Sequence, residues 1–186
     1  MDMIINTMEA FATDLRKESE IMYTFCTSGS TYTSVAFDPP ITINSFPTED
    51  ELVKKLRGKH GIYIFFVNEA VHLSREVARE WNTISGAKLA SNKDSDIAAN
   101  DCLYVGSCYS KAVSLYTRMK AHYSYDLTAS GLQLGDPKRE VLKDKVNLIV
   151  FPMKKIFSPA QRKLVLPIIE KELHDLLHPK AGVSRT

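Results

Sequence analysis

The sequence predicts a domain that mixes helices and strands, either α+β or α/β, and three observations support this. Short segments rich in β-branched and aromatic residues predict strands at 61–67, 102–107 and 146–153. Longer segments with apolar residues at helical spacing flank and separate these strands. The chain has 186 residues, of which 44% are hydrophobic, and this suits one compact domain with its own core. The direction of the strands does not follow from these patterns alone.

Two helices and a loop are predicted ahead of the first strand. Thr48 and Glu51 have the spacing of a capping box, so a helix is expected to begin at Thr48. The segment 27–47, which contains serine, threonine, glycine and two adjacent prolines, predicts a loop with a short strand around 34–37. An amphipathic helix is expected over 3–25, where apolar side chains recur at helical spacing at Ile4, Met8, Phe11, Leu15 and Met22.

Further helices are expected after each of the three strands. Residues 68–100 predict a helical insert with a helix over 74–84 and a polar loop, and residues 110–123 predict the next helix. Ser158 is the expected N-cap of the last helix, since proline follows it and glutamine stands three residues on. Pro167 is expected to kink this helix or divide it in two.

Charge and cysteine content exclude several classes of protein. The 24 basic and 22 acidic residues give a formal net charge of +2, too small to indicate nucleic-acid binding unless basic residues cluster. Cys26, Cys102 and Cys108 form neither a CxxC pair nor an even framework, so reduced intracellular thiols are expected. An acidic residue at position 2 and the lack of an apolar run argue against a signal peptide, and no stretch approaches 18 apolar residues. A cytoplasmic protein without a membrane segment is therefore expected.

An ordered set of motifs indicates the chemistry. Gly61-Ile62-Tyr63 opens the first strand, and Tyr104-Val105-Gly106 lies in the second. The following helix carries Arg118 and, four residues on, His122, while the last helix carries Glu170 nine residues before Pro179. In this order and with this spacing, residues 60–180 resemble the GIY-YIG nuclease family.

The resemblance implies an α+β fold with a small three-stranded antiparallel sheet flanked by helices. It divides the chain into an N-terminal helical extension, 1–59, and a nuclease domain, 60–186, with an insert at 68–100. The 41 residues that separate Tyr63 from Tyr104 resemble the longer connection of restriction-enzyme-like members. The sequence departs from the family at Gly182, where an asparagine is usual.

By this resemblance the chain is a metal-dependent DNA endonuclease, either a stand-alone restriction enzyme or a phage-type nuclease. Glu170 would bind the metal, Mg²⁺ with Mn²⁺ as a substitute, because Mg²⁺ accepts a single carboxylate together with water and phosphate. Arg118 would hold the scissile phosphate, which its planar guanidinium suits. Either Tyr63 or Tyr104 would serve as general base, and His122 would assist from the same helix face as Arg118.

Basic residues offer a surface for DNA if they converge near this site; otherwise they are scattered solubilising charge. Double-stranded DNA is the expected partner, and a homodimer would allow both strands to be cut. The candidates for phosphate contact are Lys111, Lys120, Lys138, Arg139, Lys154 and Lys155.

Two other functions compete with the DNA nuclease. A non-catalytic domain that binds nucleic acid or a protein partner on a GIY-YIG scaffold is the alternative, motivated by Gly182 in place of asparagine. A nuclease directed at RNA is the second. His174 and His178 have the spacing of a zinc helix, but Asp175 stands where that motif has glutamate, so a polar helix face is the preferred interpretation.

Overall fold

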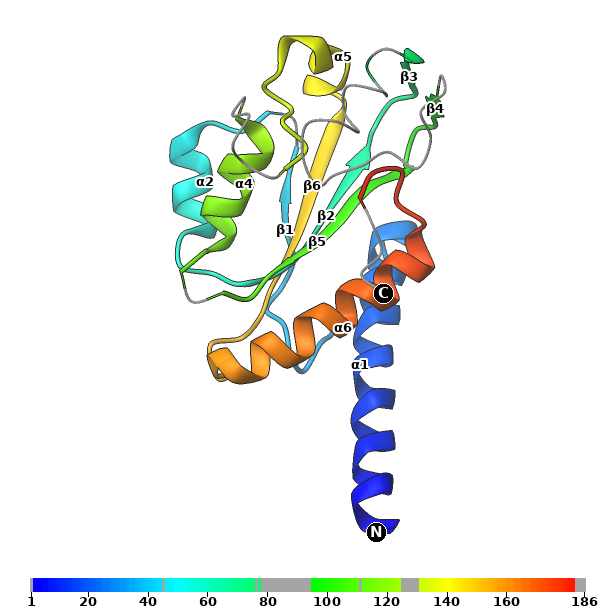
Figure 1. Cartoon of the computed structure of the whole chain (residues 1–186), viewed down its shortest axis with the longest axis vertical. Helices are drawn as coiled ribbons and strands as arrows, with labels where there is room; N and C mark the ends of the chain where they lie inside the picture. The colour runs from blue at the N-terminus through cyan, green and yellow to red at the C-terminus, as the bar shows by residue number, and fades with distance from the viewer. Residues whose placement is uncertain are drawn as a thin grey trace.

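A computed structural model describes residues 2–44, 46–75, 77, 95–110, 112–124 and 131–182. The fold is α+β, built on a four-stranded antiparallel sheet in the order β1-β6-β2-β5 (Figure 1). The strands are β1 (Ile41–Ile43), β2 (Gly61–Val67), β5 (Cys102–Cys108) and β6 (Val146–Pro152). The three strands expected from the sequence are confirmed, and their antiparallel arrangement agrees with the expectation.

The expectation of a three-stranded sheet is wrong, because β1 adds a fourth strand along β6. A strand was expected around 34–37, but Phe37 forms only an isolated bridge with Met153, and the strand begins after the two prolines. Proline has no N–H to donate to a ladder, so pairing starts beyond Pro40. Three residues are too few for their alternation to be recognised in a sequence.

Helices cover both faces of the sheet, and each face has its own core. The apolar run of β2 serves both, since Ile62 and Ile64 point to one core and Tyr63 and Phe65 to the other. The first core lies under α1 (Asp2–Ser28) and α6 (Pro159–Leu177). The second lies under α2 (Glu49–Leu56), α4 (Leu115–Tyr123) and α5 (Glu140–Lys143), which follows the short 3₁₀ helix η1 (Pro137–Arg139).

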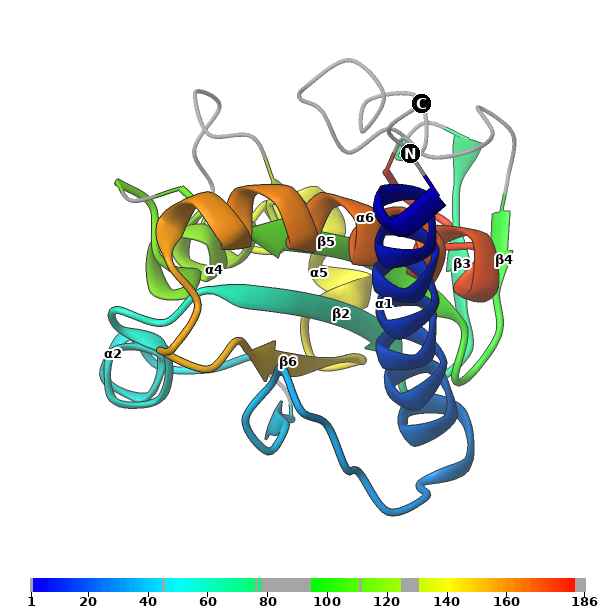
Figure 2. The same cartoon turned by 90° about the horizontal axis from the view of Figure 1, so that it is seen from below.

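The described parts of the predicted insert contain strands. β3 (Val71–Leu73) and β4 (Ser95–Ile97) pair antiparallel as a separate two-stranded sheet, which Figure 2 shows at the side of the main sheet. Most of the helix expected over 74–84 lies outside the described residues. The prediction of a helical insert is therefore wrong at the two ends of the insert. There, Val71, Leu73 and Ile97 are buried and belong to the paired strands.

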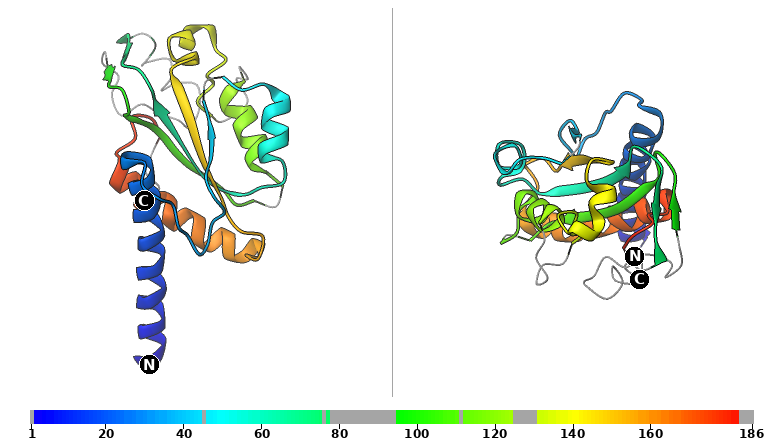
Figure 3. Two further views of the ribbon diagram at one scale, coloured as in Figure 1. Left: turned by 180° about the vertical axis from the view of Figure 1, so that it is seen from behind. Right: turned by 90° about the horizontal axis from the view of Figure 1, so that it is seen from above.

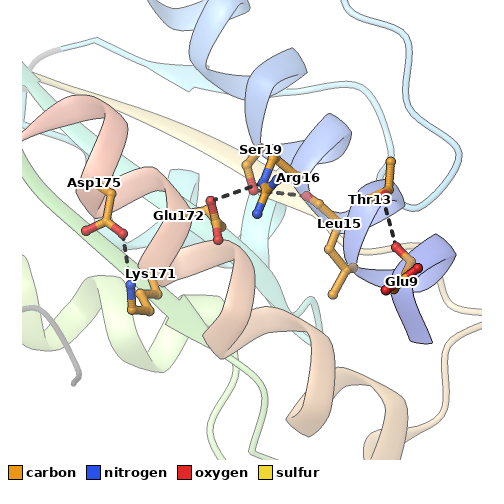
Figure 4. Close-up of polar contacts among 8 residues, drawn as sticks. All are labelled: Glu9, Thr13, Leu15, Arg16, Ser19, Lys171, Glu172 and Asp175. Atoms are coloured by element: carbon orange, nitrogen blue, oxygen red, sulfur yellow. Dashed lines mark hydrogen bonds and ion pairs between the residues drawn. The ribbon is translucent and has the colours of Figure 1, made fainter. Parts of the chain in front are cut away.

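The predicted N-terminal extension packs against the rest of the chain through its helices and its strand. Leu15 and Met22 of α1 are buried against α6, where an ion pair joins Arg16 to Glu172 at 4.0 Å (Figure 4). β1 lies in the main sheet, and α2 packs beside α4. The N-terminal half of α1 extends beyond the remainder of the molecule, as Figures 1 and 3 show.

The helix termini form as their capping residues predict. The Thr48 hydroxyl accepts the Glu51 N–H at the start of α2, and Ser158 and Gln161 form a full capping box at the start of α6. The expected division of α6 at Pro167 is wrong, since the helix is continuous. Pro167 has no N–H, so one carbonyl, that of Lys163 four positions earlier, loses its helical hydrogen bond. Lys163 is exposed, so water can hydrogen-bond to this carbonyl instead. Within the described residues, no helix is both long and apolar enough to cross a membrane.

Candidate active site

Two tyrosines from neighbouring strands form the centre of the candidate site. Tyr63 of β2 lies opposite Gly106 of β5, and Tyr104 stands two residues before that glycine. This diagonal placement brings the two rings together on the α4 side of the sheet, with centroids 6.1 Å apart and planes inclined by 20°. Tyr63 is fully buried, whereas Tyr104 is partly exposed.

Gly106 makes room for these rings. A Cβ at position 106 would collide with Cζ and the hydroxyl oxygen of Tyr63, and it would lie 2.8 Å from Cε1 of Tyr104. In the structure, the position excludes any side chain, because both tyrosine rings cross over it.

Arg118 and His122 reach Tyr63 from α4, which Ser114 caps by accepting the Thr117 N–H. The residues are four apart and so share a helix face. The Arg118 Nε–H donates to the Tyr63 hydroxyl at 3.1 Å, and His122 Nε2 lies 3.1 Å from the same oxygen. Four of the five predicted catalytic residues therefore meet in one cluster, because Tyr104 packs on both the Tyr63 and the His122 ring.

The backbone determines which nitrogen of His122 carries the proton. The N–H of Leu132 donates to His122 Nδ1 at 2.9 Å, so Nδ1 is the acceptor and Nε2 bears the hydrogen of the neutral ring. His122 is then a donor to Tyr63, as Arg118 is. Both lone pairs of the Tyr63 oxygen therefore accept hydrogen bonds, and the hydroxyl proton of Tyr63 points away from Arg118 and His122.

Burial controls the protonation of this cluster. Burial raises the pKa of Tyr63 well above its ordinary value, and nearby Tyr104 and Glu170 raise it further while Arg118 opposes them. Burial also lowers the pKa of His122 well below its ordinary value, and the Arg118 charge adds to this effect. At neutral pH, Tyr63 is therefore a phenol and His122 a neutral imidazole.

Glu170 approaches from the other face of the sheet, on α6. It is buried, and its carboxylate accepts a hydrogen bond from the Ser107 hydroxyl of β5. Its charge reaches across the sheet, since it contributes to raising the pKa of Tyr63. The sequence analysis did not identify Ser107. The available signal was its position directly after Gly106, because successive side chains of a strand point to opposite faces and Ser107 therefore points away from the tyrosines.

The segment after α6 closes the edge of the sheet beside Tyr104. Ala181 donates its N–H to the carbonyl of Leu103 at 2.8 Å, which ties the chain to β5. A Cβ at Gly182 would lie 3.2 Å from the Tyr104 ring and 3.5 Å from His174 Cε1. The position where the resemblance expects asparagine is thus beside the site, and the buried His174 ring occupies its neighbourhood.

The site offers few oxygen ligands to a hard cation such as Mg²⁺. The described residues contain no group of three or more histidine, cysteine, aspartate or glutamate side chains arranged to hold a metal. Glu170 and Ser107 place a carboxylate and a hydroxyl together. Mg²⁺ suits such a sparse set, because it usually retains several waters and binds one or two carboxylates plus phosphate.

The described basic candidates do not gather into one surface. Lys138 and Arg139 precede β6, whereas Lys154 and Lys155 follow it, so the two pairs lie at opposite ends of that strand. Lys120 is exposed but pairs with Glu49 at 2.9 Å. Lys138 and Lys155 are exposed, and Lys111 lies outside the described residues.

Two of these side chains are held by backbone carbonyls. Arg139 is buried and donates to the carbonyl of Leu132 at 2.5 Å, so the expectation of a phosphate-facing role for it is wrong. The residue instead anchors the loop that positions His122. Lys154 donates to the carbonyls of Ser34 and Val35 at 3.1 and 3.0 Å, which ties the loop after α1 to the end of β6.

The buried neutral His122 predicts that stability depends on pH. Between the ordinary histidine pKa of about 6.5 and the lower value of His122 in the fold, the unfolded chain binds a proton that the native state does not. The free energy of unfolding should therefore fall as the pH falls below about 6.5, by up to about 1.4 kcal/mol per pH unit from this residue. Urea unfolding between about pH 5 and pH 7.5 measures the slope.

A variant separates this contribution from other titrating groups. His122→Gln should flatten the slope in that range, while His178→Asn, a change at an exposed residue whose left-handed backbone asparagine tolerates, should keep it. His60, whose pKa burial also lowers, contributes equally to all three proteins. An unchanged slope in His122→Gln would show that His122 is not the titrating group.

Comparisons with known proteins identify no relative. No family model matches the chain, and neither the curated proteins nor the solved structures contain a match.

Proposed function

We propose that this protein is a metal-dependent DNA endonuclease that hydrolyses phosphodiester bonds at a site of the GIY-YIG type, as a stand-alone restriction- or phage-type nuclease. The observation that carries the proposal is the buried Tyr63 hydroxyl, which accepts from both Arg118 and His122. These donors come from positions 55 and 59 residues further along the chain. A tyrosine that only packs a core needs no such pair of donors.

Arg118 and Tyr104 are the groups that would meet the substrate. The guanidinium, held by Tyr63 through Nε, is aligned to stabilise the negative charge that develops on the phosphoryl oxygens. Tyr104, partly exposed and stacked on Tyr63, would act in its ionised form. It would take a proton from the attacking water as the new phosphorus–oxygen bond forms, and the departing sugar oxygen would take a proton from solvent as its bond to phosphorus breaks. Tyr63 and His122 position Arg118.

Glu170, with Ser107 beside it, would hold Mg²⁺ or Mn²⁺. A cation held there would supply Lewis-acid stabilisation of the charge that develops on the phosphate. The Ser107 hydroxyl fixes the carboxylate by donating to it.

Double-stranded DNA is the proposed partner, and a homodimer is the proposed cutting unit, because one such site cleaves one strand. The proposed compartment is the cytoplasm. All three cysteines are free thiols, as a reducing environment allows.

Cleavage of supercoiled plasmid with and without Mg²⁺ or Mn²⁺ tests the proposal. Glu170→Gln keeps the shape and the oxygen that Ser107 contacts but removes the charge, and Arg118→Lys keeps the charge but loses the donor to Tyr63. We expect each variant to lower the metal-dependent rate by at least about 100-fold. Glu172→Gln on the same helix and Arg16→Lys on α1 form the matched pair of controls and should cut as wild type does.

Other outcomes separate the alternatives. Salt-dependent DNA binding without metal-dependent cleavage would favour a non-catalytic binding domain. Cleavage of RNA but not of duplex DNA would favour the nuclease directed at RNA. Equal rates in wild type and both site variants would show that cleavage does not occur at this cluster.

A further inference from the structure

Basic side chains gather at one end of the main sheet. Gly61, at the start of β2, pairs with Cys108 at the end of β5 and with Pro152 at the end of β6, so these three strand ends lie together. The end of α2 and the starts of α4 and α6 lie at the same end, as Figure 1 shows. We call the basic residues there the basic end, and only Lys155 is among the phosphate-contact candidates predicted from the sequence. The basic end consists of Arg57, Lys59, Lys155, Arg162 and Lys163.

Backbone hydrogen bonds join the connections that carry these residues. The His60 carbonyl accepts the Met153 N–H at 2.8 Å, which joins the chain before β2 to the chain after β6. The Lys59 carbonyl accepts the Leu115 N–H at 2.8 Å, which joins the same segment to the start of α4. The basic end is therefore a fixed part of the fold, although its residues are far apart in the sequence.

Arg162 is oriented by a neutral partner. Its Nη1–H donates to His60 Nδ1 at 2.8 Å, because His60 Nε2 lies 3.0 Å from the Ser110 carbonyl oxygen, which can only accept. Burial lowers the pKa of His60, and the Arg162 charge lowers it further, so the ring is neutral at neutral pH. The guanidinium thus has a fixed direction and keeps its full positive charge. A guanidinium held in this way suits phosphate oxygens.

The positive charge of the basic end is not neutralised within the part of the chain that the structure describes. There, no ion pair joins any of its side chains to a carboxylate. Arg57, Lys155 and Lys163 are exposed, and Lys59 and Arg162 are partly exposed. Several lysines elsewhere do pair with carboxylates, namely Lys55, Lys120, Lys145, Lys171 and Lys180. A cluster of unpaired positive charge is typical of a surface that binds phosphates.

The basic end is continuous with the candidate site. Tyr63 follows His60 by three residues, and Arg118 lies near the start of α4. Burial raises the pKa of the Cys108 thiol to about 11, and the charges of Arg118 and Arg162 both oppose this shift. The two guanidiniums therefore lie near the same end of β5, Arg118 on the α4 side of the sheet and Arg162 on the α6 side.

We propose that the basic end binds the phosphate backbone of the DNA that is cleaved at the site. Arg162 is the fixed contact, and the other side chains of the basic end contact neighbouring phosphates. Each strand of a duplex carries one phosphate per about 3.4 Å of helix axis, so connections that lie side by side can contact successive phosphates. The inference rests on the proposed function, because the same DNA must place its scissile phosphate at Arg118.

Anisotropy of a fluorescent duplex about 20 base pairs long, in EDTA, measures binding apart from cleavage. The exposed residues are changed together, as Arg57→Gln, Lys155→Gln and Lys163→Gln. Each lost phosphate contact should lower the slope of log Kd against log salt concentration by about 0.9. This variant should therefore lose about 2–3 in slope and bind at least about tenfold more weakly at about 0.1 M salt.

A matched control removes the same charge elsewhere. It combines Lys17→Gln on α1 with Lys143→Gln and Lys145→Gln, which precede the start of β6 at the opposite end of that strand. Charges farther than about 10 Å from DNA are largely screened at about 0.1 M salt, so the control should bind within about threefold of wild type. Urea unfolding establishes that both variants are folded. Equal losses in the two variants, or an unchanged slope in the first, would overturn the proposal.

A conservative change tests Arg162 as the fixed contact. Arg162→Lys keeps the charge but loses the planar fork that His60 orients, so binding should weaken about fivefold while the salt slope stays near that of wild type. Arg57→Lys is the same change at an exposed arginine and should bind as wild type does. If Arg162→Lys also bound as wild type does, Arg162 would not be the fixed contact.

The remaining outcomes keep this inference apart from the proposed function. Loss of binding at the basic end in a protein that never cleaves DNA would remove the nuclease and leave the DNA-binding surface standing. Cleavage that depends on Glu170 but, like binding, is unchanged in the basic-end variant would leave the nuclease and overturn the surface. Binding of duplex RNA but not of duplex DNA would overturn DNA as the partner.

Discussion

Gly106→Ala is expected to abolish cleavage at the candidate site and to destabilise the fold. The added Cβ collides with the Tyr63 ring and hydroxyl and lies 2.8 Å from the Tyr104 ring. The Tyr63 ring cannot withdraw, since it is fully buried and β5 pairs with β2 on both sides of position 106. Overpacking of this kind costs about 1–3 kcal/mol, and a displacement of about 1 Å at reacting groups lowers a rate about 100-fold or more.

Plasmid cleavage and urea unfolding measure the two effects separately. Ile64→Val is the control, because Ile64 faces the opposite core on the neighbouring strand and the change costs about 0.5–1.5 kcal/mol. The control should retain cleavage at a temperature where both proteins are folded. If Gly106→Ala cut as fast as Ile64→Val, the two tyrosines would not need to cross at this glycine.

The sequence predicts the central strands and the last helix well because their signals are local. The run from Gly61 to Val67 is apolar at every position, and the strand serves two cores. Ser158 and Gln161 fall at capping-box spacing, and both capping hydrogen bonds form. β1 escaped prediction because its three residues depend on pairing with β6 rather than on a pattern of their own.

The candidate site was predictable as a set of residues but not as an arrangement. Tyr63, Arg118 and His122 were identified by motif and order, and α4 brings the last two to the Tyr63 hydroxyl. The donor state of His122 depends on the Leu132 N–H, which lies beyond the helix and contributes through its backbone. No side-chain pattern reports such a contact.

Arg139 shows why charge alone misleads. In the sequence it belongs to a basic run beside Lys138, which favours a solvated or phosphate-facing surface. In the fold it is only 2% exposed and its guanidinium holds the loop carbonyls of Leu132 and Gln133. A buried guanidinium that satisfies backbone carbonyls is a tertiary feature, and its partners are known only once the loop is placed.

The two tyrosines, which the motifs leave equivalent, are expected to respond differently to loss of the hydroxyl. The Tyr63 oxygen accepts from two donors, so it is the anchor for Arg118 and His122 and has no lone pair left for water. Tyr104 is partly exposed and packs against the outer side of Tyr63. Under the proposed function, Tyr104 is therefore the group expected to meet the attacking water.

Tyr104→Phe should lower the cleavage rate by about 10²–10⁴-fold, the usual contribution of a general base, and should leave the unfolding free energy within about 0.5 kcal/mol of wild type. Tyr63→Phe should cost about 1–3 kcal/mol of stability, because it leaves the Nε–H of Arg118 and the Nε2–H of His122 buried without their acceptor. Its rate should also fall, as Arg118 loses its alignment.

Single-turnover cleavage and urea unfolding of both variants distinguish the roles, with Tyr116→Phe, whose hydroxyl bonds Glu49 away from the site, as the matched control. The pattern that supports the assignment is a rate loss without a stability loss at Tyr104 and a loss of both at Tyr63. The reverse pattern would make Tyr63 the base, and it would require His122 to give up the Leu132 contact so that Nε2 could accept the Tyr63 proton.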